Sequence, residues 1–272
     1  MKKAAFIGAG NMGGALIRAA CRAIGPNEVL IADHQPQKAA ALARELGCTA
    51  AATNDEALCG AETVFLCVKP QVLPAVLEAL RPTLARRSSK PTMVSIAAGV
   101  RLADIRRWLG SGDETIPLLR VMPNTCAAIG QGMLALAAGE GAGEAELQAV
   151  ESILACAGRI ERLPEAQFDA FTAIAGCGPA YVYQFIEALA DGGVMAGLPR
   201  SQAQLYAAQT LLGAAALVLE SGQHPGELKD AVCSPGGSTI AGVAELERHG
   251  FRAAAIDAVL AAWEKNIALG NQ

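Results

Sequence analysis

The sequence has little of what several classes of protein require. Only three of its 272 residues are histidines, and none stands at a spacing that pairs it with a cysteine or a carboxylate, so we expect no metal site. Lysine and arginine total 22 against 26 acidic residues, the net charge is -4, and no basic cluster is present. Nucleic acids and anionic membranes both attract dense positive charge, so we expect neither as a partner.

Long hydrophobic runs and cysteine pairs are also missing. The apolar start, residues 4–7, is broken at once by glycine and is too short for a secretory signal. The most apolar segment, residues 205–219, contains polar positions and falls short of the ~20 residues of a bilayer span, so we interpret it as a buried helix. The eight cysteines include no CxxC pair, and most lie in alanine-rich or apolar runs. Reduced thiols of this kind favour a cytoplasmic protein.

A glycine motif near the start of the sequence predicts a site for a dinucleotide. Residues 4–7 predict a buried strand, and Gly8-Ala9-Gly10-Asn11-Met12-Gly13 follows directly, leading into a helix that runs to Gly25. In the fingerprint G-x-G-x-x-G the first glycine makes a tight turn, the second admits a pyrophosphate and the third lets helix pack on strand. A second strand, Val29–Ala32, ends in an acid placed to bind a ribose hydroxyl. The cofactor contacts expected here are Ile7, Gly8, Ala9, Gly10, Asn11, Met12 and Asp33.

Further strands are predicted along the first half, the early ones separated by helices. They are residues 63–68, 92–96, 118–122, 133–138 and 159–163. Strands alternating with helices predict a doubly wound parallel sheet, the Rossmann architecture, whose ligands lie outside the carboxyl ends of the strands. Distinctive residues cluster just after these strands and extend the predicted site for NADH or NADPH. The expected contacts are Val68, Lys69, Pro70, Ala97, Ala98 and Asn124, with Asn54 at the adenosine end.

The second half changes to a helical pattern. From Glu165 onwards apolar residues recur at the helical period, which predicts an α/β domain of residues 1–164 and an all-α domain of residues 165–272. The segment 205–219 carries leucine on most of its faces and needs cover on nearly all sides. About a hundred residues do not easily enclose such a helix, so we expect a second chain to cover it, with a helix buried inside a monomer as the alternative.

The stretch 228–245 contains an anion-binding pattern. Ser234-Pro235-Gly236-Gly237-Ser238-Thr239 sets hydroxyl groups and two glycines directly before a helix. Free backbone N–H groups and the positive end of that helix favour a carboxylate or phosphate. The substrate contacts expected here are Ser234, Gly236, Gly237, Ser238 and Thr239.

These strings together resemble the pyrroline-5-carboxylate reductase family. The likeness covers SPGGST with its surroundings, and VKPQ, SIAAGV and RVMPNT in the first half. It implies reduction of L-1-pyrroline-5-carboxylate to L-proline by NAD(P)H, and a C-terminal helical domain that binds substrate and forms a homodimer, with assembly into a decamer left open. The threonine that matches Thr239 is the residue proposed in that family to hydrogen-bond or protonate the ring nitrogen, so Thr239 is the expected catalytic residue.

Three positions depart from the family pattern. Cys126 and Cys177 stand where the family usually has proline and serine. Asp33 stands where small polar residues are common and NADPH is often used. An acid there repels a ribose 2′-phosphate, although His34 and Lys38 could offset its charge, so we expect a preference for NADH.

Two other functions remain open from the sequence. A β-hydroxyacid dehydrogenase or related imine reductase shares the cofactor domain but should carry a catalytic lysine on its first interdomain helix, and residues 168–189 contain none. A non-catalytic dinucleotide sensor would bind NADH without any need for the SPGGST loop. Consumption of NADH on addition of pyrroline-5-carboxylate separates all three.

Overall fold

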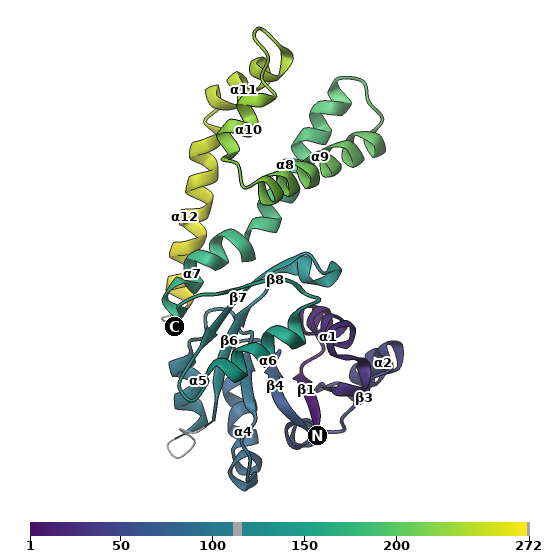
Figure 1. The fold of residues 1–272 in the computed structure, drawn as a ribbon, viewed down its shortest axis with the longest axis vertical. Coiled ribbons are helices and arrows are strands. Elements are labelled where there is room, and N and C mark those ends of the chain that lie inside the picture. Colours follow the sequence, from purple (N-terminus) through teal and green to yellow (C-terminus); the bar gives the residue numbers. More distant parts are fainter. Residues whose placement is uncertain (111–115, 271–272) are drawn as a thin grey trace. The chain divides into compact units, whose positions relative to one another are not determined.

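The computed structural model describes residues 1–110 and 116–270 and divides into two compact units (Figure 1). The first comprises Met1–Cys177 together with the end of the chain from Trp263, and the second comprises Gly178–Ala262. The boundary between an α/β and an all-α domain that we place after Pro164 stays a prediction.

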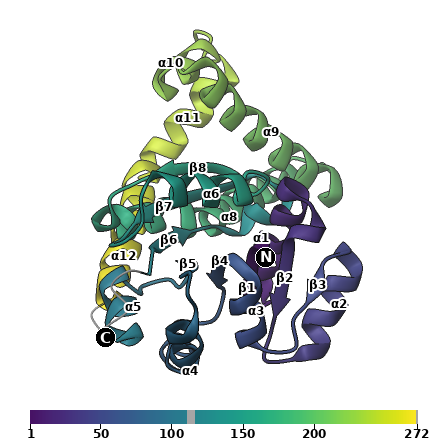
Figure 2. The same cartoon turned by 60° about the horizontal axis from the view of Figure 1, so that its bottom comes forward.

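One sheet organises the first unit, with strand order β3-β2-β1-β4-β5-β6-β7-β8 among the described residues (Figure 2). From β1 the chain builds outwards to β2 and β3, then returns to add β4, β5 and β6 on the other side of β1. This order is that of the Rossmann fold, and its reversal point lies between β1 and β4, where such sheets bind their ligands. The strands are Lys2–Ile7, Val29–Ala32, Thr49–Ala50, Ala61–Leu66, Thr92–Ser95, Leu118–Met122, Gly132–Ala138 and Gly158–Arg162, numbered β1 to β8.

The predicted parallel sheet contains one antiparallel pair among the described residues. Strand β7 pairs with β6 in the antiparallel sense, with Leu119 opposite Ala138 and Met122 opposite Ala135. The connection between them holds only the short 3₁₀ turn Thr125–Ile129. A parallel crossover needs about a dozen residues or more, so this short link makes the chain return antiparallel. The remaining pairs, including β7 with β8, are parallel.

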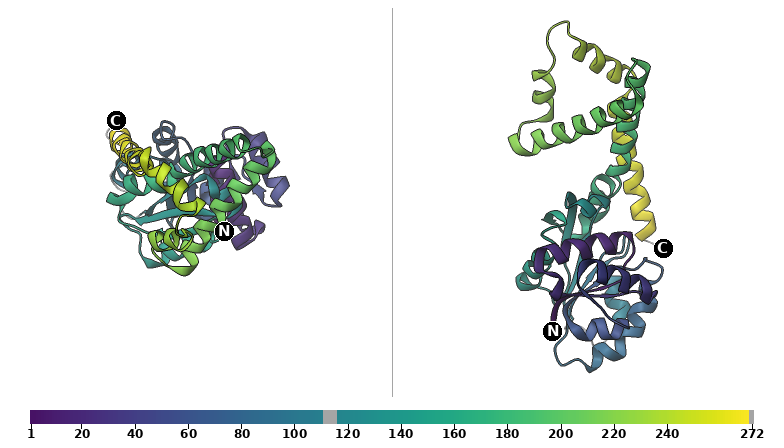
Figure 3. Two further views of the ribbon diagram at one scale, coloured as in Figure 1. Left: turned by 90° about the horizontal axis from the view of Figure 1, so that it is seen from above. Right: turned by 90° about the vertical axis from the view of Figure 1, so that its right-hand side faces the viewer.

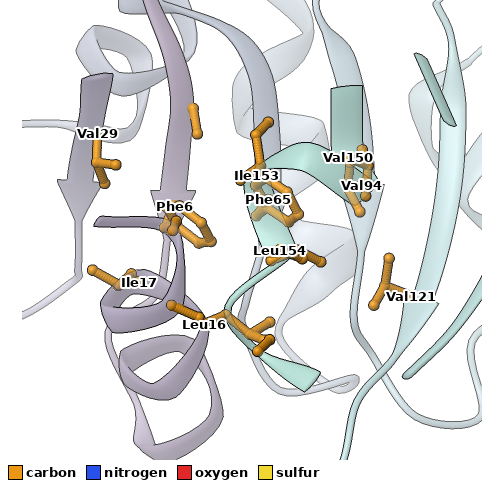
Figure 4. Packing of buried hydrophobic residues seen from close by; sticks show 14 of the residues in the cluster. Phe6, Leu16, Ile17, Val29, Phe65, Val94, Val121, Val150, Ile153 and Leu154 are labelled. Carbon is orange, nitrogen blue, oxygen red and sulfur yellow. The ribbon is translucent and has the colours of Figure 1, made fainter. Parts of the chain in front are cut away.

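Helices cover both faces of the sheet. Core residues of α1, α2 and α6 pack on one face, and those of α3, α4 and α5 on the other. On the first face the rings of Phe6 and Phe65 stack with centroids 4.5 Å apart, above Leu16 and Ile17 of α1 (Figure 4). The strands are therefore apolar on both sides, which explains their near-continuous hydrophobic runs. The helices of this unit are α1 (Asn11–Ile24), α2 (Pro36–Leu46), α3 (Asn54–Gly60), α4 (Leu73–Arg86), α5 (Leu102–Leu109), α6 (Glu144–Leu154) and α7 (Phe168–Phe171).

The second unit contains helices and no strand among the described residues (Figure 3). Its small buried core is a seam of alanines where α8 packs on α9, formed by Ala190, Ala203 and Ala207. These results confirm the predicted fold class, an N-terminal Rossmann sheet followed by a helical C-terminal part. The helices are α8 (Gly178–Met195), α9 (Arg200–Ser221), α10 (Pro225–Ala231), α11 (Ser238–Arg248) and α12 (Phe251–Gly270), the last of which continues into the first unit.

Helix α9 disagrees with the alternative of a helix buried inside a monomer. The segment 205–219 is helical, but it is not buried within a single chain, because Leu205, Leu212 and Leu219 are 63%, 61% and 73% exposed. At about 100° per residue these leucines, seven positions apart, form one stripe, and the alanine seam with α8 occupies the opposite face. A single chain thus covers only one side of α9. No single described helix combines the length and apolarity of a bilayer span, and α9 and α10 meet those criteria only together, across a bend of 119°.

Candidate functional site

The glycine loop after β1 has the geometry that its sequence predicts. Gly8 adopts φ +107°, and a Cβ atom there would lie 2.5 Å from the carbonyl oxygen of Cys67. A Cβ atom on Gly13 would lie 2.2 Å from the carbonyl oxygen of Gly8, so the start of α1 is pressed directly against the loop. A Cβ atom on Gly10 would meet nothing within 4 Å. The first and third glycines are required by the fold, whereas the second faces open space, as a site for an approaching phosphate requires.

Asp33 ties the end of β2 to this loop. Its Oδ2 accepts a hydrogen bond from the Ala9 N–H at 2.7 Å, and its Oδ1 accepts one from the Gln35 N–H at 2.9 Å. The Nδ1 atom of His34 lies 3.0 Å from the same Oδ1. The Asp33 side chain is only 4% exposed, whereas that of His34 is 82% exposed. The carboxylate is therefore held in place by backbone donors on two sides.

A pocket of about 550 Å³ opens beside the glycine loop, between α1 and α2. Gly10, Asn11 and Gly14 line one side, and Lys38 lines the other. A dinucleotide fits this setting, since the positive end of α1 and the open backbone at Gly10 suit a pyrophosphate. A second cavity, of about 490 Å³, lies beside Lys2 at the amino ends of the strands, and none of the predicted site residues lines it.

Three ionisable groups near the loop have shifted pKa values. Arg18 and Glu45, which line the same pocket, form a hydrogen-bonded ion pair, which lowers the pKa of Glu45 and raises that of Arg18. Burial raises the pKa of the Cys67 thiol beneath the loop. Both effects leave the pocket's ionic state unchanged near neutral pH, with the thiol protonated and the ion pair charged.

The remaining predicted cofactor residues follow the carboxyl ends of β4, β5 and β6. Val68 and Pro70 are half-buried and Lys69 is exposed just after β4, beside the reversal point of the sheet. The loop after β5 places Ala97 in the core and leaves Ala98 exposed. Ile7 is itself buried, so only its backbone faces the loop region, and Asn54 is half-buried at the start of α3.

Asn124 is engaged in bonds to the protein. Its Nδ2 donates to the Ala175 carbonyl at 2.9 Å, and its Oδ1 accepts from the Met133 N–H at 3.3 Å. Ala175 belongs to a π-helical turn, Thr172–Gly176, closed by a hydrogen bond of 2.9 Å from the Cys177 N–H to the Thr172 carbonyl. Asn124 therefore joins the loop after β6 to this turn, and its contact with a cofactor stays a prediction. Sequence reasoning missed the π turn, which is a feature often found at functional sites.

A buried arginine is the second feature that sequence reasoning missed. Arg120, in the middle of β6, is 5% exposed in its side chain and bonds through Nη1 to Oε1 of Glu165 at 3.0 Å. The same Glu165 oxygen accepts the Leu102 N–H at 2.8 Å, and the guanidinium lies 4.8 Å from the centroid of the Phe168 ring. A charged residue inside the predicted strand 118–122 was the available signal. Its partner could not be located from the sequence.

The substrate residues predicted in the second unit form one compact loop. The Ser234 carbonyl accepts the Gly237 N–H at 3.0 Å, with Pro235 and Gly236 at the corner and φ +68° at Gly236. Proline followed by a glycine of positive φ is the signature of a type II turn. Helix α11 then begins at Ser238, and the Ala241 N–H donates to the Gly237 carbonyl at 3.4 Å. The N–H groups of the first turn thus have no acceptor within the helix.

The hydroxyl groups of this loop are accessible. Ser234, Ser238 and Thr239 are all exposed in the single chain, and Gly237 lies close to the Ser234 hydroxyl. The loop therefore gathers the five predicted substrate contacts at the positive end of an eleven-residue helix. Among the described residues no group of three or more histidine, cysteine or acidic side chains is placed to hold a metal ion.

Comparisons with known proteins agree on one family. A family model described as pyrroline-5-carboxylate reductase dimerisation matches residues 165–269, and one described as NADP oxidoreductase, coenzyme F420-dependent, matches residues 3–99. The pyrroline-5-carboxylate reductase of Pisum sativum is 42% identical over 262 residues, covering 96% of this chain and 93% of its own. That of Synechocystis is 42% identical over 269 residues, covering 98% of each chain.

Solved structures give the same result. The pyrroline-5-carboxylate reductase of Coxiella burnetii superposes with a TM-score of 0.90 at 30% identity, over 98% of each chain. The pyrroline carboxylate reductase of Plasmodium falciparum, solved with NADP bound, superposes with a TM-score of 0.85 at 30% identity, over 99% of this chain and 98% of its own.

Proposed function

The chain belongs to the pyrroline-5-carboxylate reductase family, and from that premise we propose that residues 234–239 hold the substrate while the glycine loop, residues 8–13, holds the cofactor. The protein is an oxidoreductase that reduces L-1-pyrroline-5-carboxylate to L-proline with NAD(P)H, in proline biosynthesis. The observation that carries the substrate assignment is the exposed start of α11, where a type II turn leads into a helix whose first N–H groups have no acceptor within it.

The substrate carboxylate is the group that this loop suits. Backbone N–H groups at the positive end of α11 favour an anion, and the hydroxyls of Ser234 and Ser238 add donors. Gly236 and Gly237 carry no side chain that would keep the carboxylate away from the backbone. The loop thereby fixes one end of the cyclic imine and orients the rest of the ring.

Thr239 is our candidate for the ring nitrogen. A protonated imine is already electrophilic, so the protein needs to align it, exclude water and hydrogen-bond the nitrogen as it becomes an amine. The reduced nicotinamide, when bound, supplies the hydride. Thr239 stands in the first turn of α11, one residue after Ser238, and its hydroxyl is exposed. Lys69 is a weaker candidate because its ammonium would disfavour a neighbouring iminium.

The cofactor assignment rests on the residues at the carboxyl ends of the strands. Gly8, Gly10 and Gly13 have the geometry that supports pyrophosphate binding after β1. We propose that the backbone of residues 7–12, the loop 68–70 and the loop 97–98 complete the site, with Asn54 at the adenosine end. Asn124 is proposed to act here as well, through the loop that its side-chain bonds hold in place.

We further propose that the protein works as a homodimer. The leucine stripe of α9, formed by Leu205, Leu212 and Leu219, is exposed in the single chain and faces away from the α8 seam. Residues 165–269 match a dimerisation model, which supports a second copy as the cover. A cytoplasmic location is also proposed, since the eight cysteines are free thiols.

Spectrophotometry of the purified chain tests the function. We expect oxidation of the reduced nicotinamide that depends on added pyrroline-5-carboxylate. Thr239→Ala should lower kcat/KM by roughly 1–3 kcal/mol in transition-state terms while NADH binding stays intact. Thr239→Ser, which keeps a hydroxyl, is the matched control and should retain most activity.

Two results would contradict these assignments. An unchanged kcat/KM in Thr239→Ala removes the catalytic role of this hydroxyl. Binding of NADH without any substrate-dependent oxidation would indicate a dinucleotide sensor rather than a reductase.

A further inference from the structure

The fixed position of Asp33 bears on which cofactor the protein selects. Two backbone N–H groups, those of Ala9 and Gln35, hold its two carboxylate oxygens at 2.7 and 2.9 Å. With 4% of the side chain exposed, the carboxylate has almost no free space into which it could rotate. A rotation would also leave the Ala9 N–H without its acceptor inside the glycine loop.

NADPH differs from NADH by a phosphate on the adenosine ribose, and an acid at the end of the second strand meets that ribose in Rossmann folds. A fixed carboxylate would face the phosphate as a like charge. Of the cations that line the neighbouring pocket, Arg18 is paired with Glu45, and Lys38 lies exposed on the first turn of α2. His34 is directed to Asp33 itself. The charge of Arg18 is therefore committed to an acidic partner, and Lys38 is the other cation among the residues that line this pocket.

We propose that Asp33 is a specificity-determining residue with two separable effects: its charge makes this reductase prefer NADH to NADPH, and its oxygen holds the glycine loop through Ala9. The inference rests on the proposed cofactor site and concerns selection between two cofactors that both supply hydride. The ribose hydroxyls of NADH can donate to the lone pairs that remain on the carboxylate, whereas a 2′-phosphate offers no proton donor of comparable strength at neutral pH.

Two substitutions separate these effects. Asp33→Asn removes the charge but keeps an oxygen that can accept from the Ala9 N–H. The Gln35 N–H loses its acceptor, but Gln35 is exposed, so water can accept that hydrogen bond instead. Asp33→Ala removes both the charge and the acceptor. Glu62→Gln, an equal change of charge at an exposed position of β4, is the matched control.

Direct titration of NADH and NADPH into the full-length protein, followed by nicotinamide fluorescence without substrate, gives the two dissociation constants. We expect the original protein to bind NADH about tenfold more tightly than NADPH, because repulsion by the fixed carboxylate exceeds the attraction of the exposed Lys38 ammonium. Asp33→Asn should bring that ratio close to one, and Glu62→Gln should leave it unchanged. Asp33→Ala should also bring the ratio towards one, but with weaker binding of both cofactors and a lower thermal midpoint of the cofactor-free protein.

Equal or tighter binding of NADPH by the original protein would overturn the proposal, and so would an unchanged ratio in Asp33→Asn. Binding of neither cofactor would overturn it together with the cofactor site. Absence of substrate-dependent oxidation with either cofactor, in a protein that still shows the expected ratio, would instead contradict the proposed reaction and leave the selection by Asp33 standing. If Asp33→Ala fails to fold, Asp33→Asn still decides the effect of charge.

Discussion

The two units of this chain differ in how much of their apolar surface they bury alone. In the first, Phe6, Phe65 and Phe168 are fully buried, because helices on both faces of the sheet close two cores. In the second, large apolar side chains such as Leu212 and Leu219 remain more than half exposed. The sheet buries its apolar side chains within one chain because helices cover both of its faces. The helices of the second unit bury only a small seam of alanines against one another. The second unit therefore exposes apolar surface of the kind that contacts other proteins.

The glycine loop of the first unit and the turn at residues 234–237 of the second unit also differ in how closely other atoms surround them. The glycine loop of residues 8–13 is enclosed by backbone on two sides, at distances that exclude any side chain at Gly8 or Gly13. The turn at residues 234–237 is exposed, and a Cβ atom on Gly236 would meet nothing within 4 Å. Substitution should therefore disturb folding at the first loop and mainly binding at the second.

The largest expected effect concerns Gly13. Gly13→Ala places a methyl group 2.2 Å from the Gly8 carbonyl oxygen, so α1 must move away from the loop. We expect a loss of about 3 kcal/mol of stability and of measurable NADH binding. Gly10→Ala is the control, because its methyl group meets nothing within 4 Å and its φ of -67° suits alanine. It should keep its stability in urea unfolding yet bind NADH more weakly. Equal stability of the two variants would contradict the tight packing of the loop.

An intermediate effect is expected at Glu165. Glu165→Ala leaves the buried Arg120 guanidinium without its carboxylate and the Leu102 N–H without its acceptor. Because the Glu165 side chain is 27% exposed, we expect its removal to cost less than the loss of a fully buried partner, about 2 kcal/mol, which urea unfolding would measure. Glu165→Gln keeps an oxygen for Leu102 and should lose less. If Glu165→Ala unfolds at the same urea concentration as the original protein, the pair contributes nothing to the first unit.

The smallest effect on the stability of a single chain is expected at Leu212. This position tests whether the exposed apolar side chains of the second unit are covered by a second copy. Leu212→Glu places a charge on the exposed leucine stripe of α9, so the helix content of the chain should hardly change. Dimerisation should be lost, because a buried charge without a partner is costly at an interface. Light scattering should then report 27.8 kDa instead of twice that mass.

Gln204→Glu adds a charge to the same helix about 100° away from Leu205, off the stripe, and is the matched control. It should keep the dimer. A mass of 27.8 kDa for the original protein at micromolar concentration would reject the dimer altogether.

Local patterns were enough for much of the first unit. The strands Val29–Ala32 and Leu118–Met122 occur with the predicted bounds, because each is a short apolar run between turn residues. The predicted strand 63–68 instead spans Ala61–Leu66, since residues 67 and 68 leave the ladder to form the loop after β4. Strand β3 was not predicted, because two residues carry no periodic signal.

Hydrogen bonds between residues far apart in the sequence were not predicted, and the reason is physical. The bond between Arg120 and Glu165 joins residues 45 positions apart, and that between Asn124 and Ala175 joins residues 51 apart. Hydrophobic periodicity records which side of an element is buried, but it does not record which distant polar group lies opposite. The turn at residues 234–237 was predictable because proline, glycine and hydroxyl residues specify it within six consecutive positions.

The glycine loop, the acid after the second strand and the SPGGST turn were predictable from the sequence, because each is a local pattern whose physics operates over a few residues. Only the tertiary structure decided that β7 runs antiparallel, that Asp33 is held by the Ala9 N–H, and that the leucines of α9 remain uncovered in one chain. Each of these depends on which segments meet in space. That outcome is set by loop length and by packing between distant elements, which no single stretch of sequence contains.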